Sequence, residues 1–207
     1  MYIPKEFKET NQNEILDFIG KNALGILVSS TGIFEPLVSH IPFISSLEND
    51  EIILEGHLAI KNPHAEQIKK GKTALVIFQG PNAYISSSVY THENVPTWNY
   101  QAVHLYGTVE ILTKSELQNH LAQAIDYFES ERTNKLDYSK FSKSMLENYL
   151  NEIIGFRLRA YKIEAAYKMS QNRNEADFQN IVTDLSESKN PLDQEVAKEM
   201  YKLKNNR

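Results

Sequence analysis

The chain reads YQAVHLYGTVEIL over residues 100–112, and this segment indicates the fold more directly than any other. Apolar side chains occupy one parity, namely Val103, Leu105, Val109 and Ile111. Polar and aromatic side chains occupy the other, namely Tyr100, His104, Tyr106 and Thr108. Because side chains alternate between the two faces of a strand, the segment predicts a strand with one packed face and one face free for a ligand or partner.

Strand-like segments continue on both sides of it. Apolar or β-branched runs cover residues 24–30, 34–45, 51–55, 72–79, 83–88 and 153–161. Turn residues separate neighbouring runs at Thr31-Gly32, Asn49-Asp50 and Gly80-Pro81-Asn82. About six or seven strands with few helices between them favour a mostly antiparallel sheet closed into a barrel over a doubly wound parallel sheet.

Helical spacing and capping residues place helices between and after these strands. We expect helices over residues 10–22, 63–70, 113–128, 144–151, 175–185 and 192–203. Asn62-Pro63 supplies an N-cap and a first-turn proline, and Thr113 with Glu116 forms a capping-box pattern. The predicted organisation is mostly β with flanking helices: one domain over residues 1–170, including helices near 114–151, and a C-terminal helical appendage over 171–207.

Composition limits the classes of function. With 207 residues, of which 41% are hydrophobic, the chain can bury a core of its own without a disulfide, and it has no cysteine for disulfides or thiolate catalysis. No apolar run is long enough for a membrane span, and the N-terminus lacks the apolar core of a signal peptide, so a cytoplasmic location is expected. The net charge of −5 repels the phosphates of nucleic acid, and residues 189–207 offer only five basic against three acidic residues. Direct DNA binding is therefore disfavoured.

Two segments mix hydroxyl, amide and aromatic side chains most densely: YISSSVY at 84–90 and NVPTWNYQAVH at 94–104. Broad aromatic faces beside a few fixed polar groups suit a planar ligand rich in heteroatoms. A tyrosine-rich strand pair joined by a polar loop has the same composition. The residues alone leave both interpretations open.

Two further segments carry groups that bind phosphate. GHLAIKNP at 56–63 places His57 and Lys61 beside a helix start, where the helix dipole attracts anions. KMSQNRN at 168–174 places Lys168 and Arg173 before another helix, and an arginine there can pair bidentately with a phosphate. The alternative for each is an ordinary capped helix with solvated cations.

Several catalytic and metal-binding patterns are missing from the sequence. No close metal-ligand spacing joins His40, His57, His64, His92 and His104. We expect His64 to face solvent. Ser86, Ser87 and Ser88 do not lie in a Gly-x-Ser-x-Gly elbow, and there is no dinucleotide-binding or P-loop glycine motif. The sequence therefore names no catalytic residue.

Eight short motifs, in one order and spread over nearly the whole chain, resemble PaiB-type proteins. They are MYIP at 1–4, SHIP at 39–42, GHLA at 56–59, NP at 62–63, FQGP at 78–81, AYIS at 83–86, VPTWNY at 95–100 and SQNR at 170–173. The resemblance implies an antiparallel split β-barrel of the pyridoxamine-phosphate-oxidase-like superfamily that binds FMN as a homodimer. Members often read Ala-Arg followed by a small residue before Asn-Pro, whereas Ile60 and Lys61 occupy that stretch here, so the arginine's charge is either replaced by Lys61 or absent from the site.

The resemblance also implies a set of cofactor-binding residues. Val38, Ser39, His40 and Ile41 would lie along the isoalloxazine ring. His57, Lys61 and Asn62 would hold the phosphate, with Leu58 and Ala59 beside them. Ile85, Ser86 and Ser87 would approach the ribityl chain. Either Trp98, or Gln171 and Arg173, would close the site from the partner subunit.

Two functions follow from the resemblance. PaiB-type proteins are described as negative transcriptional regulators, or repressors, of sporulation and of degradative enzyme synthesis, so the first is a flavin-binding regulator that acts through a protein partner or metabolite. The alternative is a flavin-dependent reductase or oxidase of unknown substrate, in which the flavin itself would carry the chemistry.

Overall fold

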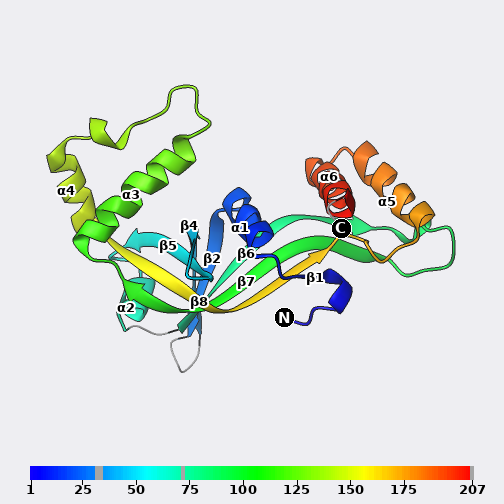
Figure 1. Ribbon diagram of the computed structural model, residues 1–207, viewed down its shortest axis with the longest axis horizontal. Helices are drawn as coiled ribbons and strands as arrows, with labels where there is room; N and C mark the ends of the chain where they lie inside the picture. Colours follow the sequence, from blue (N-terminus) through cyan, green and yellow to red (C-terminus); the bar gives the residue numbers. More distant parts are fainter. Residues whose placement is uncertain (31–34, 71–72, 206–207) are drawn as a thin grey trace. The chain divides into compact units, whose positions relative to one another are not determined.

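The computed structural model describes residues 1–30, 35–70 and 73–205 (Figure 1). Eight strands form one sheet in the order β3-β2-β6-β7-β8-β5-β4, and β1 pairs with β8. Their bounds are β1 Lys8–Glu9, β2 Leu24–Ser30, β3 Pro36–Pro42, β4 Ile44–Glu48, β5 Glu51–Ala59, β6 Thr73–Ile85, β7 Thr97–Ile111 and β8 Ile153–Lys168. Every pair whose register is described is antiparallel, which confirms the predicted sheet type.

Six α-helices and three 3-10 turns lie before, between and after the strands in the described chain. They are α1 Gln12–Lys21, α2 His64–Lys69, α3 Lys114–Glu129, α4 Lys143–Glu152, α5 Glu175–Glu187 and α6 Pro191–Asn205, with 3-10 turns η1 Lys5–Phe7, η2 Ser87–Val89 and η3 Tyr138–Lys140. No helix among the described residues combines the length and apolar character that a bilayer crossing requires.

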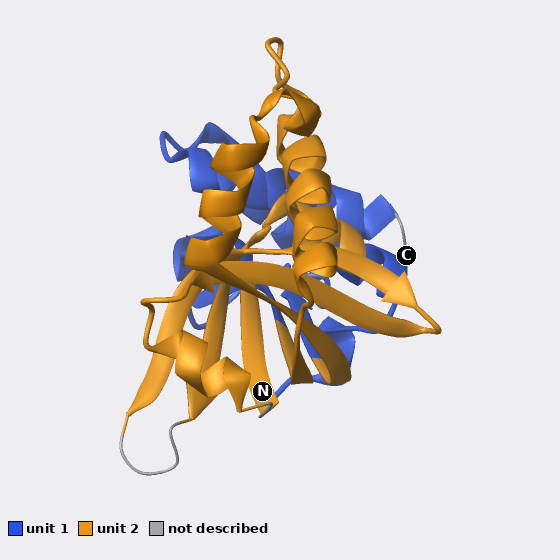
Figure 2. Ribbon diagram, turned by 90° about the vertical axis from the view of Figure 1, so that its left-hand side faces the viewer, with its two compact units in different colours: residues 1–15, 79–103, 164–207 blue, residues 16–78, 104–163 orange. Residues whose placement is uncertain are grey.

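The chain divides into two compact units (Figure 2). Unit 1 comprises Met1–Ile15, Gln79–Val103 and Glu164–Arg207, and unit 2 comprises Leu16–Phe78 and His104–Ile163. The strands β6, β7 and β8 each contribute residues to both units. The predicted boundary at residue 170 stays a prediction.

The interior of unit 2 is built around Phe43, which is 1% exposed. Its ring packs edge-on against Phe78 and Phe156, with centroids 5.7 and 5.9 Å away. A side chain at Gly56 on β5 would come within 3.1 Å of Ile41 and Phe43. The end of β3 therefore faces β5 across the interior, although the two strands are far apart in the sheet order, so the sheet of unit 2 curls.

The strands of unit 2 follow the predicted runs, except that β5 continues to Ala59 and one predicted run is divided. The run expected over 34–45 is two strands, β3 and β4, which are separated at Phe43, and Phe34 lies outside the described residues. The predicted turn at Asn49-Asp50 is present, with φ angles of 49° and 65°. Two successive positive φ angles match a tight hairpin turn whose twist suits β4 and β5.

The turn predicted at Gly80-Pro81-Asn82 is wrong, because β6 continues through it from Thr73 to Ile85. The described register pairs β6 with β2 only at Leu75, Val76 and Ile77. Pro81 lies beyond that pairing, and a proline is tolerated where a strand needs no ladder hydrogen bond from its nitrogen. The alternation predicted along β7 is confirmed, with Val103 and Leu105 fully buried, but Ile111 at its end is 41% exposed.

Two helix pairs complete the units. In unit 2, α3 begins at the predicted capping box: Glu116 N donates to Thr113 Oγ1 at 3.3 Å, and Thr113 N donates to Glu116 Oε2 at 2.8 Å. The helices α3 and α4 stand side by side (Figures 1 and 2) over a small core of Leu112, Leu117, Leu121, Leu150 and Ile153. In unit 1, α5 and α6 pack together, with Phe178, Ile181, Val196 and Met200 buried.

Candidate functional site

A polar cluster in unit 2 joins β2, β3 and the start of α2. His64 is 1% exposed, and its Nδ1 and Nε2 lie 2.9 Å from Ser39 Oγ and 2.8 Å from Ser29 Oγ. Asn62 Nδ2 donates to Ser39 Oγ at 3.2 Å, and His64 N donates to Asn62 Oδ1 at 2.9 Å. We call Ser29, Ser39, Asn62 and His64 the serine–histidine cluster.

The prediction that His64 faces solvent is wrong. The Asn62 side chain caps the turn as expected, but the following residue turns inward and bridges two strands. Burial lowers the pKa of His64, so the ring is neutral near pH 7 and has one donor and one acceptor nitrogen. One serine therefore donates to the ring and the other accepts from it.

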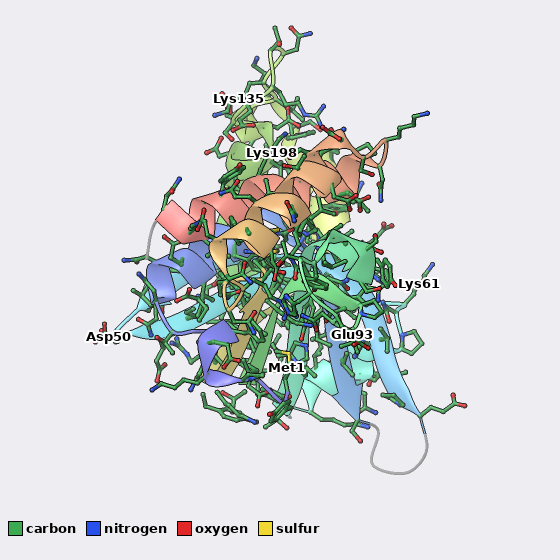
Figure 3. All side chains as sticks on the ribbon, turned by 90° about the vertical axis from the view of Figure 1, so that its right-hand side faces the viewer. Met1, Asp50, Lys61, Glu93, Lys135 and Lys198 are labelled. Carbon is green, nitrogen blue, oxygen red and sulfur yellow. The ribbon has the colours of Figure 1, made fainter. Side chains whose placement is uncertain are left out.

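The other predicted residues of unit 2 surround this cluster unevenly. Ile41 and Leu58 are buried, at 2% and 6% exposed, so they help form the interior. Val38, His40 and Ala59 are exposed. Lys61 is exposed as well, and its side chain extends away from the ribbon (Figure 3).

His57 lies in a different environment from Asn62 and Lys61. On β5, His57 lies between Gly56 and Leu58, which are on the face of the strand that packs into the interior. Because successive side chains point to opposite faces, the His57 ring is on the other face. There His57 Nδ1 is 3.1 Å from His120 Nε2 on α3, and His57 Nε2 is 3.3 Å from Tyr149 Oη on α4. Burial, and then the neighbouring His120, lower the pKa of His57 to about 4, and burial alone lowers the pKa of His120 to about 4.

The histidine pair continues into an ionic network. His120 Nδ1 is 3.7 Å from Glu55 Oε2 and makes no hydrogen bond within the part of the chain that the structure describes. Arg157 donates from Nε and Nη2 to Glu55 Oε1, at 2.8 and 2.5 Å, and its Nη1 is 3.6 Å from Glu116 Oε1. Glu55 Oε1 therefore accepts two hydrogen bonds from one guanidinium.

The predicted residues of unit 1 fall into two groups, the first at the end of β6. Ile85 is buried at 2% exposure, and Ser86 Oγ caps the 3-10 turn η2 by accepting from Ser88 N at 3.2 Å. Ser87 is exposed. Trp98 is 53% exposed and stacks edge-on with Tyr84 at a centroid distance of 5.8 Å. An exposed aromatic pair of this kind leaves a ring face open.

The second group lies at the turn after β8. Gln171 holds the turn, because its Oε1 accepts from Met169 N at 2.7 Å and its Nε2 donates to Tyr167 O. Arg173 lies over the Tyr90 ring, 4.8 Å from the centroid. Lys168 donates to Thr97 Oγ1, and burial together with the positive charge of Arg173 lowers the pKa of Lys168. Neither cation pairs with a carboxylate among the described residues.

The structure thus divides the predicted site between the units. Within unit 2 it joins Ser39 to Asn62, which Lys61 directly precedes in the chain. His57 belongs instead to the histidine pair. Within unit 1 it places Arg173 close to Lys168. Sequence reasoning missed Ser29, His64, His120 and Tyr149. No spacing could reveal them, since His57 and His120 are 63 positions apart.

Comparisons with solved structures identify the fold. The FAD and Heme binding protein from Mycobacterium smegmatis is similar over 78% of this chain and 73% of its own, with 18% identity and a TM-score of 0.59. The flavocytochrome Anf3 from Azotobacter vinelandii is similar over 86% of this chain and 78% of its own, with 11% identity and a TM-score of 0.60. The fold is a split barrel with flanking helices, which confirms the predicted class.

Sequence comparison identifies the family. The family model described as "Putative FMN-binding domain" matches residues 1–162. The Bacillus subtilis (strain 168) protein named "Protease synthase and sporulation protein PAI 2" is 43% identical over 200 residues, which cover 97% of this chain and 96% of the relative. The chain belongs to this PaiB-type FMN-binding family, and its cofactor is FMN.

The residues present fit this cofactor. A phosphate needs donors and positive charge, and the Ser39 hydroxyl, the Asn62 amide and the Lys61 ammonium supply both in unit 2. Lys168 and Arg173 supply two uncompensated cations in unit 1. Within the described ranges, no group of three or more His, Asp or Glu side chains is arranged to hold a metal ion.

Proposed function

We propose that the chain is an FMN-binding regulatory protein of the cytoplasm, whose effect on protease synthesis and sporulation depends on the flavin. The serine–histidine cluster carries this proposal, because it places a fixed group of donors beside an open strand edge. The printed name of the Bacillus subtilis relative supports the regulatory part. FMN, when bound, supplies one- and two-electron redox chemistry.

The edge of β3 suits the polar side of an isoalloxazine ring. In the described registers β3 pairs only with β2, and it is the first strand in the sheet order. Its other edge therefore offers backbone N–H and C=O groups, which are the groups that can bind the ring's carbonyls and imide. The exposed Val38 adds apolar surface on the same strand. We assign Val38, His40 and Ile41 to the ring and Ser39, Lys61 and Asn62 to the phosphate.

A homodimer would complete the site. Trp98, Tyr84 and Val95 in unit 1 are 53%, 51% and 71% exposed, which is more apolar surface than a monomer favours. We assign Trp98 and Arg173 to contacts with the flavin bound by the partner subunit. Sedimentation should give a dimer, and Trp98→Asp should shift it toward monomer and weaken FMN.

Regulation through a protein partner or metabolite is more consistent with the charges than direct DNA binding. Of the basic residues near the C-terminus, Lys202 lies 3.6 Å from Glu14, and Lys204 pairs with Glu175. These contacts neutralise part of a weakly basic segment. A gel shift with a strong inverse dependence on salt would overturn this preference.

The test combines FMN titration with a genetic assay. Asn62→Asp keeps the oxygen that caps α2 but replaces the amide donor with a negative charge, so FMN affinity should fall at least about tenfold. Asn11→Asp is the matched control, since Asn11 caps α1 in the same way, with Asn13 N donating to its Oδ1 at 3.0 Å. FMN affinity of the control should not change.

In a Bacillus subtilis strain lacking PAI 2, the wild-type chain and Asn11→Asp should restore normal extracellular protease and spore levels, and Asn62→Asp should not. Equal restoration by Asn62→Asp, despite its lost FMN affinity, would separate the regulation from the flavin. Rapid reduction of bound FMN by a nicotinamide cofactor would favour the reductase or oxidase alternative.

A further inference from the structure

A cavity of about 240 Å³ lies in unit 2 between β5, α3 and α4. Its wall on α3 is apolar and is formed at helical spacing by Leu121, Ala124, Ile125 and Phe128. His57 and Tyr149 form its polar end. Phe128 and Tyr149 are 42% and 44% exposed, so the cavity is accessible from solvent.

The direction of the hydrogen bonds at the polar end follows from the tautomer of His120. Glu55 accepts from Arg157 and its Oε2 lies 3.7 Å from His120 Nδ1, which favours a proton on that nitrogen although no hydrogen bond forms there, and leaves His120 Nε2 as an acceptor. His57 Nδ1 then donates to His120 Nε2, and His57 Nε2 accepts from the Tyr149 hydroxyl. Both rings are neutral at pH 7 because their pKa values are lowered to about 4.

This direction decides what Tyr149 can offer to a ligand. The Tyr149 hydroxyl donates its single proton to His57 Nε2, so its oxygen has only lone pairs to offer to the cavity. It therefore favours a ligand that donates a hydrogen bond. The apolar wall disfavours a charged ligand, and the carboxylate of Glu129 at the cavity disfavours an anion most of all. An apolar cavity of roughly 150 Å³ takes up benzene, so this larger one has room for a substituted ring or two fused rings.

We propose that this cavity binds a small, uncharged aromatic molecule of one or two rings that carries a single N–H or O–H donor, of the indole or phenol class. The rings pack on Leu121, Ala124 and Phe128, and the donor binds the Tyr149 oxygen. Pro42 at the end of β3 also lines the cavity, but none of the residues assigned to FMN in this unit does, so the two sites are distinct. The protein would therefore bind a second small molecule in addition to FMN.

The experiment compares indole with 1-methylindole, which has nearly the same shape but no donor. Titrations of the FMN-saturated protein are followed by the ring ¹⁵N signals of His57 and His120. Indole should bind saturably, with a dissociation constant below about 1 mM, and 1-methylindole roughly threefold to tenfold more weakly, the cost of one net hydrogen bond. Indole-3-acetate should bind more weakly than either.

Two variants and one control make the result specific. Tyr149→Phe, a conservative change at an exposed position, should make the affinities for indole and 1-methylindole equal. Ala124→Phe should fill the cavity and abolish the binding of both. Tyr201→Phe, at another exposed helical tyrosine, should change neither. Absence of saturable indole binding, an unchanged preference in Tyr149→Phe, or competition between indole and FMN would overturn the proposal.

Discussion

Ser39 Oγ lies 2.9 Å from Nδ1 of His64, and this hydrogen bond ties the edge strand β3 to the first turn of α2. The other ring nitrogen of His64 reaches Ser29 on β2 at 2.8 Å. One buried imidazole therefore holds together the strand and the helix start to which we assign FMN. The geometry of the proposed site depends on this ring.

His64→Leu should lower the free energy of unfolding by roughly 1 to 3 kcal/mol, because it leaves the buried Ser29 hydroxyl without its partner and the half-buried Ser39 hydroxyl with only the Asn62 amide. Urea denaturation without flavin measures the change. His40→Leu, on the exposed face of β3, should change it by less than about 0.5 kcal/mol. Equal effects of the two variants would contradict the structural role of His64.

Stability should fall as the pH is lowered from about 6.5 toward 4. The pKa values of His57 and His120 are about 4 in the folded protein and 6.5 when unfolded, so in this window the unfolded chain binds protons that the folded chain does not. The loss is roughly 3 kcal/mol per histidine at most. His120→Gln, which keeps an acceptor for His57, should reduce the slope of unfolding free energy against pH, while His57 and His64 continue to contribute to it.

Lys61→Gln should weaken FMN and flatten the dependence of FMN affinity on salt, since the lysine acts through its charge. The exposed position predicts a change in stability below about 0.5 kcal/mol without flavin. Fluorescence titration at low and high salt checks both, with Lys69→Gln on α2 as the control. An FMN affinity identical to wild type at every salt concentration would remove Lys61 from the phosphate site.

Arg173→Ala should weaken FMN more than riboflavin, because riboflavin lacks the phosphate with which a guanidinium pairs. The difference should be about 1.5 to 3 kcal/mol of binding free energy. Loss of the contact with the Tyr90 ring should separately cost about 0.5 to 1 kcal/mol of stability. Should both ligands weaken equally, Arg173 acts by holding the turn before α5.

Local patterns predicted helices and strands well wherever residues close together in the sequence determine the structure. The capping box at Thr113 and Glu116 and the alternation along β7 depend on neighbouring residues, and both are present. The turn at Pro81 failed because a proline breaks a strand only where the ladder needs its nitrogen, and sequence does not reveal where β2 stops pairing.

The site was harder to predict because its members meet only after folding. Asn62 as a cap was visible in the sequence, but the inward turn of His64 depends on Ser29 and Ser39 from two other strands. His57 was grouped with Lys61 because they are close in the chain. The side-chain alternation of β5 places it instead with His120 and Tyr149.

The three long strands that contribute to both units restrict which insertions and deletions the chain can accept during evolution. A single-residue insertion within β7 would keep the side chains on their proper faces in one unit and reverse them in the other, because alternation has a period of two. Natural selection should therefore preserve the lengths of β6, β7 and β8 and accept length changes in segments such as 130–142 between α3 and α4. Neither unit is one continuous stretch of the gene, so recombination could not have exchanged either as a module.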